Sequence, residues 1–184
     1  MSDILKRAVA EKYLFNKYSS SYPKLFAAQK RFISKVLSSV PKKEIHHIGS
    51  TSVPNLGGKK VLDVLVIVEK KHFSKSKKLL HNFGYEYDHT MAGKRHFHKK
   101  YYVDYLGVPR LVHLHLTYFG SGAKEVALAF REYLKHHKKT RVEYAKIKRE
   151  ASKRYSFEGK KYSKHKLSFL KSTLKKALKW YKQQ

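Results

Sequence analysis

The spacing of apolar and polar residues predicts helices at both ends of the chain and strands between them. Apolar residues recur every three or four positions over 4–18 and 23–40, which predicts two helices. The same spacing returns from residue 124 onward and predicts three more helices. Short glycine-containing breaks at 120–122 and 157–159 separate these elements, and neither is long enough to be a domain linker.

The middle of the chain has the pattern of strands. A helix over 73–83, ended by Gly84, interrupts them. The stretches expected to be strands are 44–48, 61–69, 85–88, 95–105 and 111–118. We therefore expect an α+β fold, a mixed sheet with flanking helices, in one domain over 1–184. The sheet core would occupy about 44–120 and the helical tail about 124–183.

Polar side chains interrupt two of the predicted strands. Asp63 lies inside an apolar strand that follows the glycine turn at 47–51, where an acid is unusual. It needs either a satisfied partner such as a neighbouring Lys, or a role as a metal or phosphate ligand. In the last strand, His113 and His115 point to the same face, because side chains alternate with period two.

Charge is the strongest feature of the composition. The 184 residues include 42 Lys or Arg against 13 Asp or Glu, a formal net charge of +29, and 41% hydrophobic residues fill a core. Such a field attracts phosphate-rich partners, both nucleotides and RNA, and makes their binding salt-sensitive. Lysine-rich, solvated helix faces without a polyanion partner explain the charge equally well.

The chain has no cysteine, so any metal must bind through His, Asp or Glu. No apolar segment is long enough to cross a bilayer, so we expect no membrane partner and a cytoplasmic location. The sequence does not indicate an oligomeric state.

The turn and the strand after it closely resemble the signature of GrpB-like proteins. In that signature a histidine precedes Gly-Ser-Thr, Val-Pro follows, and a Lys stands four residues before an Asp. The matching positions are His47, Gly49, Ser50, Thr51, Val53, Pro54, Lys59 and Asp63, and further matches are Gly84-Tyr85, Arg95, His113, His115, 130–134, Tyr144, Lys148, Tyr162 and Lys166. The resemblance implies a polymerase-beta-type nucleotidyltransferase fold and transfer of a nucleoside monophosphate from a nucleoside triphosphate.

The resemblance also implies roles for individual residues. Phosphate or nucleotide would be bound by Gly49, Ser50, Thr51, Lys59 and Arg95, and Asp63 would be the catalytic acid and a metal ligand. A lone Gly-Ser is usually just a turn, but its spacing to Asp63 favours phosphate handling. The departure that matters most for the chemistry is Leu65, which stands where the superfamily has its second acid. With a single carboxylate, divalent cations lack anionic ligands.

Two histidines offer a replacement for the missing acid. If their strand neighbours that of Asp63, then Asp63, His113 and His115 form a facial metal site. Mg²⁺ or Mn²⁺ is the expected cofactor, and two imidazoles also suit Zn²⁺, Fe²⁺ or Ni²⁺. The equally weighted alternative is that both histidines contact phosphate or their neighbours without metal. Supporting roles are expected for His47, Arg131, Tyr144, Tyr162 and Lys166.

Three classes of function compete at this point. The first is a metal-dependent nucleotidyltransferase with an unknown acceptor. The second is a non-catalytic binder of nucleotide, RNA or another phosphorylated ligand, which Leu65 and the lysine excess favour. The third is a structural basic protein, which explains the charge but not the residues from Gly49 to Asp63.

Overall fold

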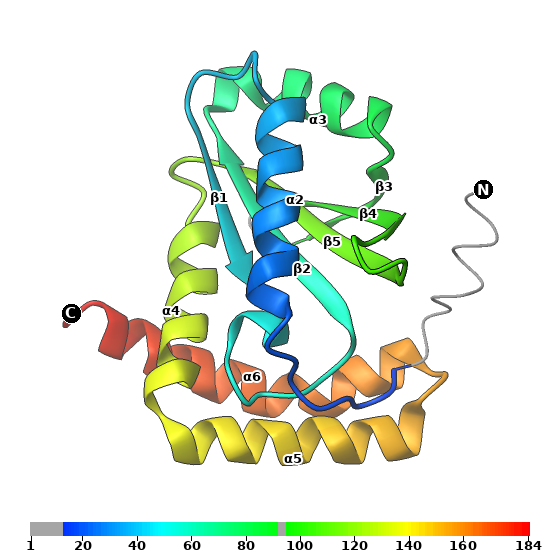
Figure 1. The fold of residues 1–184 in the computed structure, drawn as a ribbon. Helices are drawn as coiled ribbons and strands as arrows, with labels where there is room; N and C mark the ends of the chain where they lie inside the picture. Colours follow the sequence, from blue (N-terminus) through cyan, green and yellow to red (C-terminus); the bar gives the residue numbers. More distant parts are fainter. Residues whose placement is uncertain (1–12, 92–94) are drawn as a thin grey trace.

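Five strands form one mixed sheet at the centre of the fold (Figure 1). The computed structural model describes residues 13–91 and 95–184. Across the sheet the strands follow the order β1-β2-β5-β4-β3. Only β2 and β5 pair in parallel, and the other neighbours are antiparallel. The strands are β1 Lys43–Ile48, β2 Val61–Val68, β3 Glu86–Met91, β4 Arg95–Val103 and β5 Pro109–Tyr118. The expected mixed α+β architecture is confirmed.

One face of the sheet is covered by α2 (Tyr22–Val36) and α3 (Phe73–Asn82). Alternate residues of β2, among them Val64 and Val66, point to this face and are fully buried. They join the largest apolar cluster with residues of both helices, such as Ile33 and Leu80. This layer holds the core of the fold, and it leaves the opposite face of β2 for other contacts.

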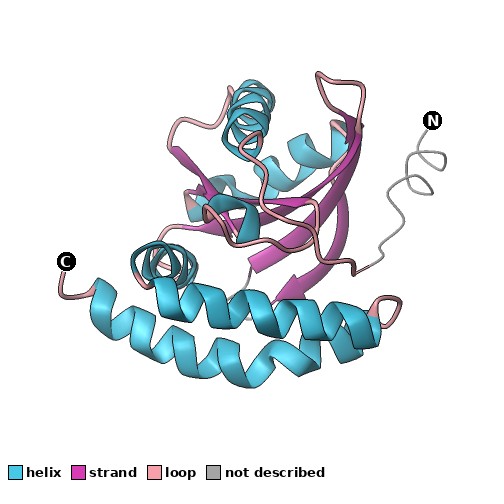
Figure 2. Ribbon diagram, turned by 60° about the horizontal axis from the view of Figure 1, so that its bottom comes forward, coloured by secondary structure: helices cyan, strands magenta, loops and turns pink. Residues whose placement is uncertain are grey.

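The three C-terminal helices cover the opposite face. These are α4 (Ala123–His136), α5 (Lys138–Tyr155) and α6 (Gly159–Tyr181), and they confirm the three helices expected from the apolar spacing. Leu65 and Ile67 of β2 pack here against Leu128 of α4. Figure 2 shows the long α5 and α6 side by side along this side of the sheet. Within the described ranges, no helix combines the length and apolar character needed to cross a membrane.

The predicted helix at 4–18 is not found where the structure can test it. Residues 4–12 lie outside the described residues, and 13–18 are not helical but irregular, with one isolated β-bridge from Asn16 to Gly58. Asn16 exchanges two backbone hydrogen bonds of 2.8 Å with Gly58, and the Phe15 amide donates to Ser152 Oγ at 2.8 Å. The segment therefore satisfies its backbone through partners distant in sequence, which local spacing does not reveal.

The whole-chain single domain remains a prediction.

Candidate functional site

The glycine turn sits directly against the acid of β2. Gly49 follows the end of β1 and has φ +70, a conformation that favours glycine. A Cβ built on Gly49 would lie 2.1 Å from Oδ2 of Asp63. Only a residue without a side chain lets the turn approach the carboxylate so closely. Ser50–Ser52 then form a single 3-10 turn.

The parallel pairing of β2 and β5 brings the predicted acid and histidines together. Asp63 is directly opposite His113, and Leu65 is opposite His115. The Nδ1 atom of His113 lies 3.4 Å from Asp63 Oδ1, and the Nε2 atom of His115 lies 3.9 Å from the same oxygen. The convergence expected from the sequence is thus present, on the sheet face that the C-terminal helices cover.

These contacts control the protonation of the site. Burial opposes ionisation of Asp63, but the hydrogen bonds and charges of His113 and His115 outweigh it and hold the pKa of the carboxyl well below its usual range. Burial lowers the pKa of His115, although Asp63 acts in the opposite direction. Asp63 is therefore an ionised carboxylate at neutral pH, with two imidazole rings beside it.

The position of the superfamily's second acid is buried in an apolar cluster. Leu65 is fully buried and packs against Ile48, Ile67 and Leu128 under α4. Within 13–91 and 95–184, no group of three or more His, Asp or Glu has an arrangement that could hold a metal ion. As arranged, Asp63 forms an ion pair with His113 at 3.4 Å, and His115 Nε2 lies 3.9 Å from the same oxygen. The metal set stays a prediction.

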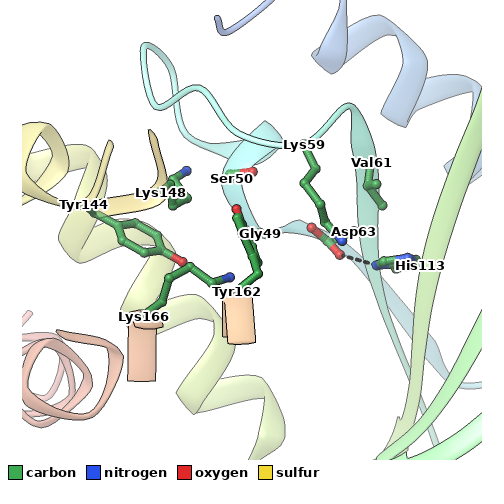
Figure 3. Close-up of a pocket in the computed structure, with 10 residues that line it drawn as sticks. All are labelled: Gly49, Ser50, Lys59, Val61, Asp63, His113, Tyr144, Lys148, Tyr162 and Lys166. Carbon is green, nitrogen blue, oxygen red and sulfur yellow. Dashed lines mark ion pairs between the residues drawn. The ribbon is translucent and has the colours of Figure 1, made fainter. Parts of the chain in front are cut away.

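A cavity of about 200 Å³ opens beside this ion pair (Figure 3). Three lysines from different parts of the chain line it: Lys59 from the loop before β2, Lys148 from α5 and Lys166 from α6. Asp63 is the only acid among the described residues of its lining, which also includes Gly49, Ser50, Val61, His113, Tyr144 and Tyr162. We call this space the lysine cavity. Its wall carries an excess of positive charge.

Each of the three lysines lies over a tyrosine ring. The Nζ atom of Lys148 is 4.6 Å from the centre of the Tyr144 ring, and that of Lys166 is 4.3 Å from the Tyr162 ring. The Lys59 ammonium is 4.3 Å from the ring of Tyr13. Ring faces attract cations and hold these flexible side chains toward the cavity.

Lys148 and Lys166 are partly desolvated, and each is affected by the charge of a neighbouring lysine. Burial, together with the charge of Lys166, lowers the pKa of Lys148 to about 7. Burial, together with the charge of Lys59, lowers the pKa of Lys166 to about 8. Lys148 is only 3% exposed, and its ammonium donates to the carbonyls of Leu56 and Gly57. An anion in the cavity would relieve this mutual repulsion.

Several residues expected at the site lie outside the lining of the lysine cavity. Thr51 is buried, donates to the Val61 carbonyl at 3.3 Å and contacts His47 Nε2 at 3.0 Å. Arg131 of α4 donates to the His47 carbonyl at 2.7 Å. These three residues hold the turn in place and do not line the cavity. Burial lowers the pKa of His47 to about 4, despite the charge of Asp63, so its ring is neutral at pH 7.

The other expected residues divide between two places. Tyr144, Tyr162 and Lys166 line the lysine cavity as anticipated for supporting residues. Arg95, expected to bind phosphate, lines a separate hollow that shares Gly49 with the lysine cavity.

Lys148 was matched to the GrpB-like signature but was not expected to act at the site. A signal for it exists in the sequence. Tyr144 and Lys148 are four residues apart, and Tyr162 and Lys166 repeat this spacing. Residues four apart share a helix face, so the repeated Tyr-x-x-x-Lys pattern indicates two equivalent pairs.

Comparisons with known proteins agree with this architecture. The sequence profile of the GrpB protein family matches residues 14–176, so the chain belongs to the GrpB family. The crystal structure of the conserved protein GrpB from Enterococcus faecalis is similar, with a TM-score of 0.77 and 29% identity over 91% of this chain and 99% of that one.

Relatives of known sequence extend the comparison. UPF0157 protein YqkA of Bacillus subtilis is 32% identical over 75% of this chain and 39% of its own length. UPF0157 protein BH1888 of Halalkalibacterium halodurans is 27% identical over 87% of this chain and 80% of its own length. The chain thus spans less than two thirds of YqkA.

A more distant likeness concerns the Cid1 poly(U) polymerase in a structure bound to MgATP. Its TM-score is 0.48, with 15% identity over 76% of this chain and 44% of that one. This likeness is too remote to support a statement about activity.

Proposed function

We propose that the lysine cavity binds the phosphate groups of a nucleoside triphosphate or another phosphorylated ligand. The observation that carries this proposal is the convergence of Lys59, Lys148 and Lys166 on one cavity whose described lining contains a single acid. Charge-assisted hydrogen bonds from ammonium groups to phosphate oxygens are about twice as strong as neutral ones. The lowered pKa values of Lys148 and Lys166 also support an anion there, because it would stabilise both ammonium forms.

The turn adds neutral donors to these cations. Gly49 and Ser50 both line the cavity. A backbone without a Cβ at Gly49 allows close approach of a phosphate, and the Ser50 hydroxyl supplies one more donor. The site therefore offers both charged and neutral hydrogen-bond donors to phosphate oxygens.

The direct test is binding of ATP and of inorganic tripolyphosphate, measured by isothermal titration calorimetry with Mg²⁺ and again with EDTA. Lys166→Met should weaken both ligands about tenfold, equivalent to about 1.4 kcal/mol. Lys164→Met is the matched control, because Lys164 is an exposed lysine on the same helix. Equal loss in both variants would show nonspecific attraction to a basic protein and overturn the proposal.

A second candidate is transfer of a nucleoside monophosphate from the bound triphosphate to an acceptor. Asp63, ionised and within the same cavity, favours this candidate, as does membership of the GrpB family with its resemblance to nucleotidyltransferases. In such a transfer an acceptor hydroxyl oxygen bonds to the α-phosphorus, the bond to pyrophosphate breaks, and the hydroxyl proton passes to a base. A divalent cation held by Asp63 would supply charge neutralisation.

Asp63→Asn separates the two candidates. For a binder, removing a negative charge from the cavity should tighten tripolyphosphate binding a few-fold, about 1 kcal/mol. For a transferase, the variant should abolish labelled nucleotide transfer and pyrophosphate release from all four triphosphates in Mg²⁺ or Mn²⁺. Absence of turnover in the unaltered protein with a broad set of acceptors would leave binding as the function. Transfer that persists in Asp63→Asn would contradict the catalytic role of this acid.

RNA is a further ligand of the binding function, because the charge of +29 is spread well beyond the cavity. Its affinity should fall steeply with salt, whereas a small ligand held inside the cavity should be less sensitive.

A further inference from the structure

A second hollow shares Gly49 with the lysine cavity. It has a volume of about 290 Å³ and is lined mainly by apolar side chains of α4 and α6: Val126, Ala127, Phe130, Leu170 and Leu174. Of the described residues in its lining, Arg95 is the only charged one. We call this space the apolar cavity. Its chemistry is the opposite of that of the lysine cavity.

A third, smaller hollow borders both cavities. It has a volume of about 50 Å³ and shares Gly49, Ser50 and Tyr144 with the lysine cavity. It shares Gly49, Ala127 and Phe130 with the apolar cavity. Because Gly49 lines all three, the spaces are neighbours along the turn.

Size argues that one ligand extends over these neighbouring spaces. Small-molecule sites usually measure roughly 300–1,000 Å³, and they are mostly apolar with a few polar groups. The lysine cavity, at about 200 Å³, is smaller than such sites and suits a phosphate chain. Together the three spaces fall within the usual range, which points to a ligand with one anionic end and one apolar end.

We infer that the apolar cavity receives the base of a nucleotide whose phosphate groups occupy the lysine cavity. The inference rests on the proposed phosphate-binding function and deepens it, because it selects a nucleotide over bare polyphosphate. The aliphatic side chains and Phe130 contact the faces of a flat ring. Arg95 supplies a planar guanidinium that stacks on rings and donates to their acceptor atoms.

Arg95 also argues against an acyl chain in this space. Its guanidinium is partly buried, and burial lowers its pKa while the charge of Asp63 acts against the change. Covering a charged group with an alkyl chain leaves its N–H donors without acceptors, which is costly. A heterocyclic base carries ring nitrogens and carbonyl oxygens that accept these hydrogen bonds.

The test compares ligands that share the phosphate chain and differ in the base. Calorimetry measures the affinities for ATP, GTP, CTP, UTP and inorganic tripolyphosphate. At least one of the triphosphates should bind about tenfold more tightly than tripolyphosphate, because base contacts of this kind contribute roughly 1–3 kcal/mol. Ala127→Trp, which fills the apolar cavity, should remove this advantage and leave tripolyphosphate within about twofold of its original affinity.

Two variants keep the test clear of folding artefacts. Val142→Trp places the same side chain on α5 at a position that is 60% exposed, and it should change nothing. Leu174→Trp fills the cavity from α6 and replaces Ala127→Trp if that protein does not fold by circular dichroism.

The two ways to fail are distinct. If tripolyphosphate and the triphosphates bind equally, or Ala127→Trp and Leu174→Trp weaken all ligands alike, the base site is wrong and phosphate binding stands. If no ligand binds in the lysine cavity, as judged by Lys166→Met, the proposed function itself is wrong.

Discussion

A Cβ on Gly49 would lie 2.1 Å from the Oδ2 atom of Asp63, which is too close for any side chain, so the turn packs directly against the acid. Gly49 also lines the lysine cavity, the apolar cavity and the hollow between them. The position of this one residue therefore sets both the conformation of Asp63 and the path of any ligand.

Gly49→Ala should destabilise the protein and weaken ligand binding. The left-handed backbone and the collision with Asp63 together should cost about 3 kcal/mol or more of the free energy of unfolding. Gly107→Ala is the matched control, with φ +73 and no described atom within 4 Å of its added Cβ. It should cost about 1 kcal/mol and leave binding unchanged. Equal losses in urea unfolding would contradict the proposed contact.

Phosphate binding should take up protons at a pH above neutrality. The pKa of Lys148 is about 7 in the free protein, and an anion beside the ammonium raises it. Tripolyphosphate affinity should therefore fall as pH rises from about 6.5 to 9, and calorimetry in buffers of different ionisation enthalpy should detect the uptake. Lys148→Met should reduce the uptake, while exposed Lys146→Met should not. A flat affinity over this range would argue against Lys148 as a ligand.

Leu65→Asp, which restores the acid expected by resemblance, should unfold the protein and not create a metal site. Leu65 is fully buried among Ile48, Ile67 and Leu128, and an uncompensated acid there should cost at least about 4 kcal/mol. Leu65→Met should cost less than about 1.5 kcal/mol because volume is conserved. A stable Leu65→Asp protein that binds Mn²⁺ would show that the site tolerates two acids.

Acid should destabilise the fold through a buried histidine of β4 that pairs with Leu114 and lies outside the lining of the lysine cavity. His98 is fully buried, and burial lowers its pKa to about 4, although a hydrogen bond to the Tyr85 carbonyl raises it. Unfolded histidine has a pKa near 6.5, so the unfolded chain binds more protons between about pH 6.5 and 4. The free energy of unfolding should fall on the order of 3 kcal/mol as pH falls through this window.

His98→Leu should flatten this acid dependence, as measured by chemical denaturation at several pH values. His89→Leu is the control, because the side chain of His89 is 54% exposed. An unchanged slope in His98→Leu would mean that another group, such as His47 with its similarly lowered pKa, dominates the effect.

The sequence predicted most of the fold because its signals are local. Alternation in β2 and β5 and helical spacing after residue 124 reflect which side of each element is buried, and these elements appear as expected. The same reasoning was wrong for residues 13–18. Their aromatic residues pack on distant partners, as Tyr13 does on Tyr162 at 4.9 Å between ring centres.

The candidate site also combines features that local sequence patterns predict with features that depend on contacts between distant residues. By itself the sequence determined the fold class, the family resemblance, and that His113 and His115 share one strand face, since side chains alternate with period two. The tertiary structure decided that this strand pairs with that of Asp63, which brings the three side chains together. Only the tertiary structure decided that Lys148 joins Lys59 and Lys166, that Thr51 faces inward, and that Arg95 borders a separate apolar cavity. These placements depend on how helices 123–181, the glycine turn and the strands pack against one another, and local spacing does not state which distant elements meet.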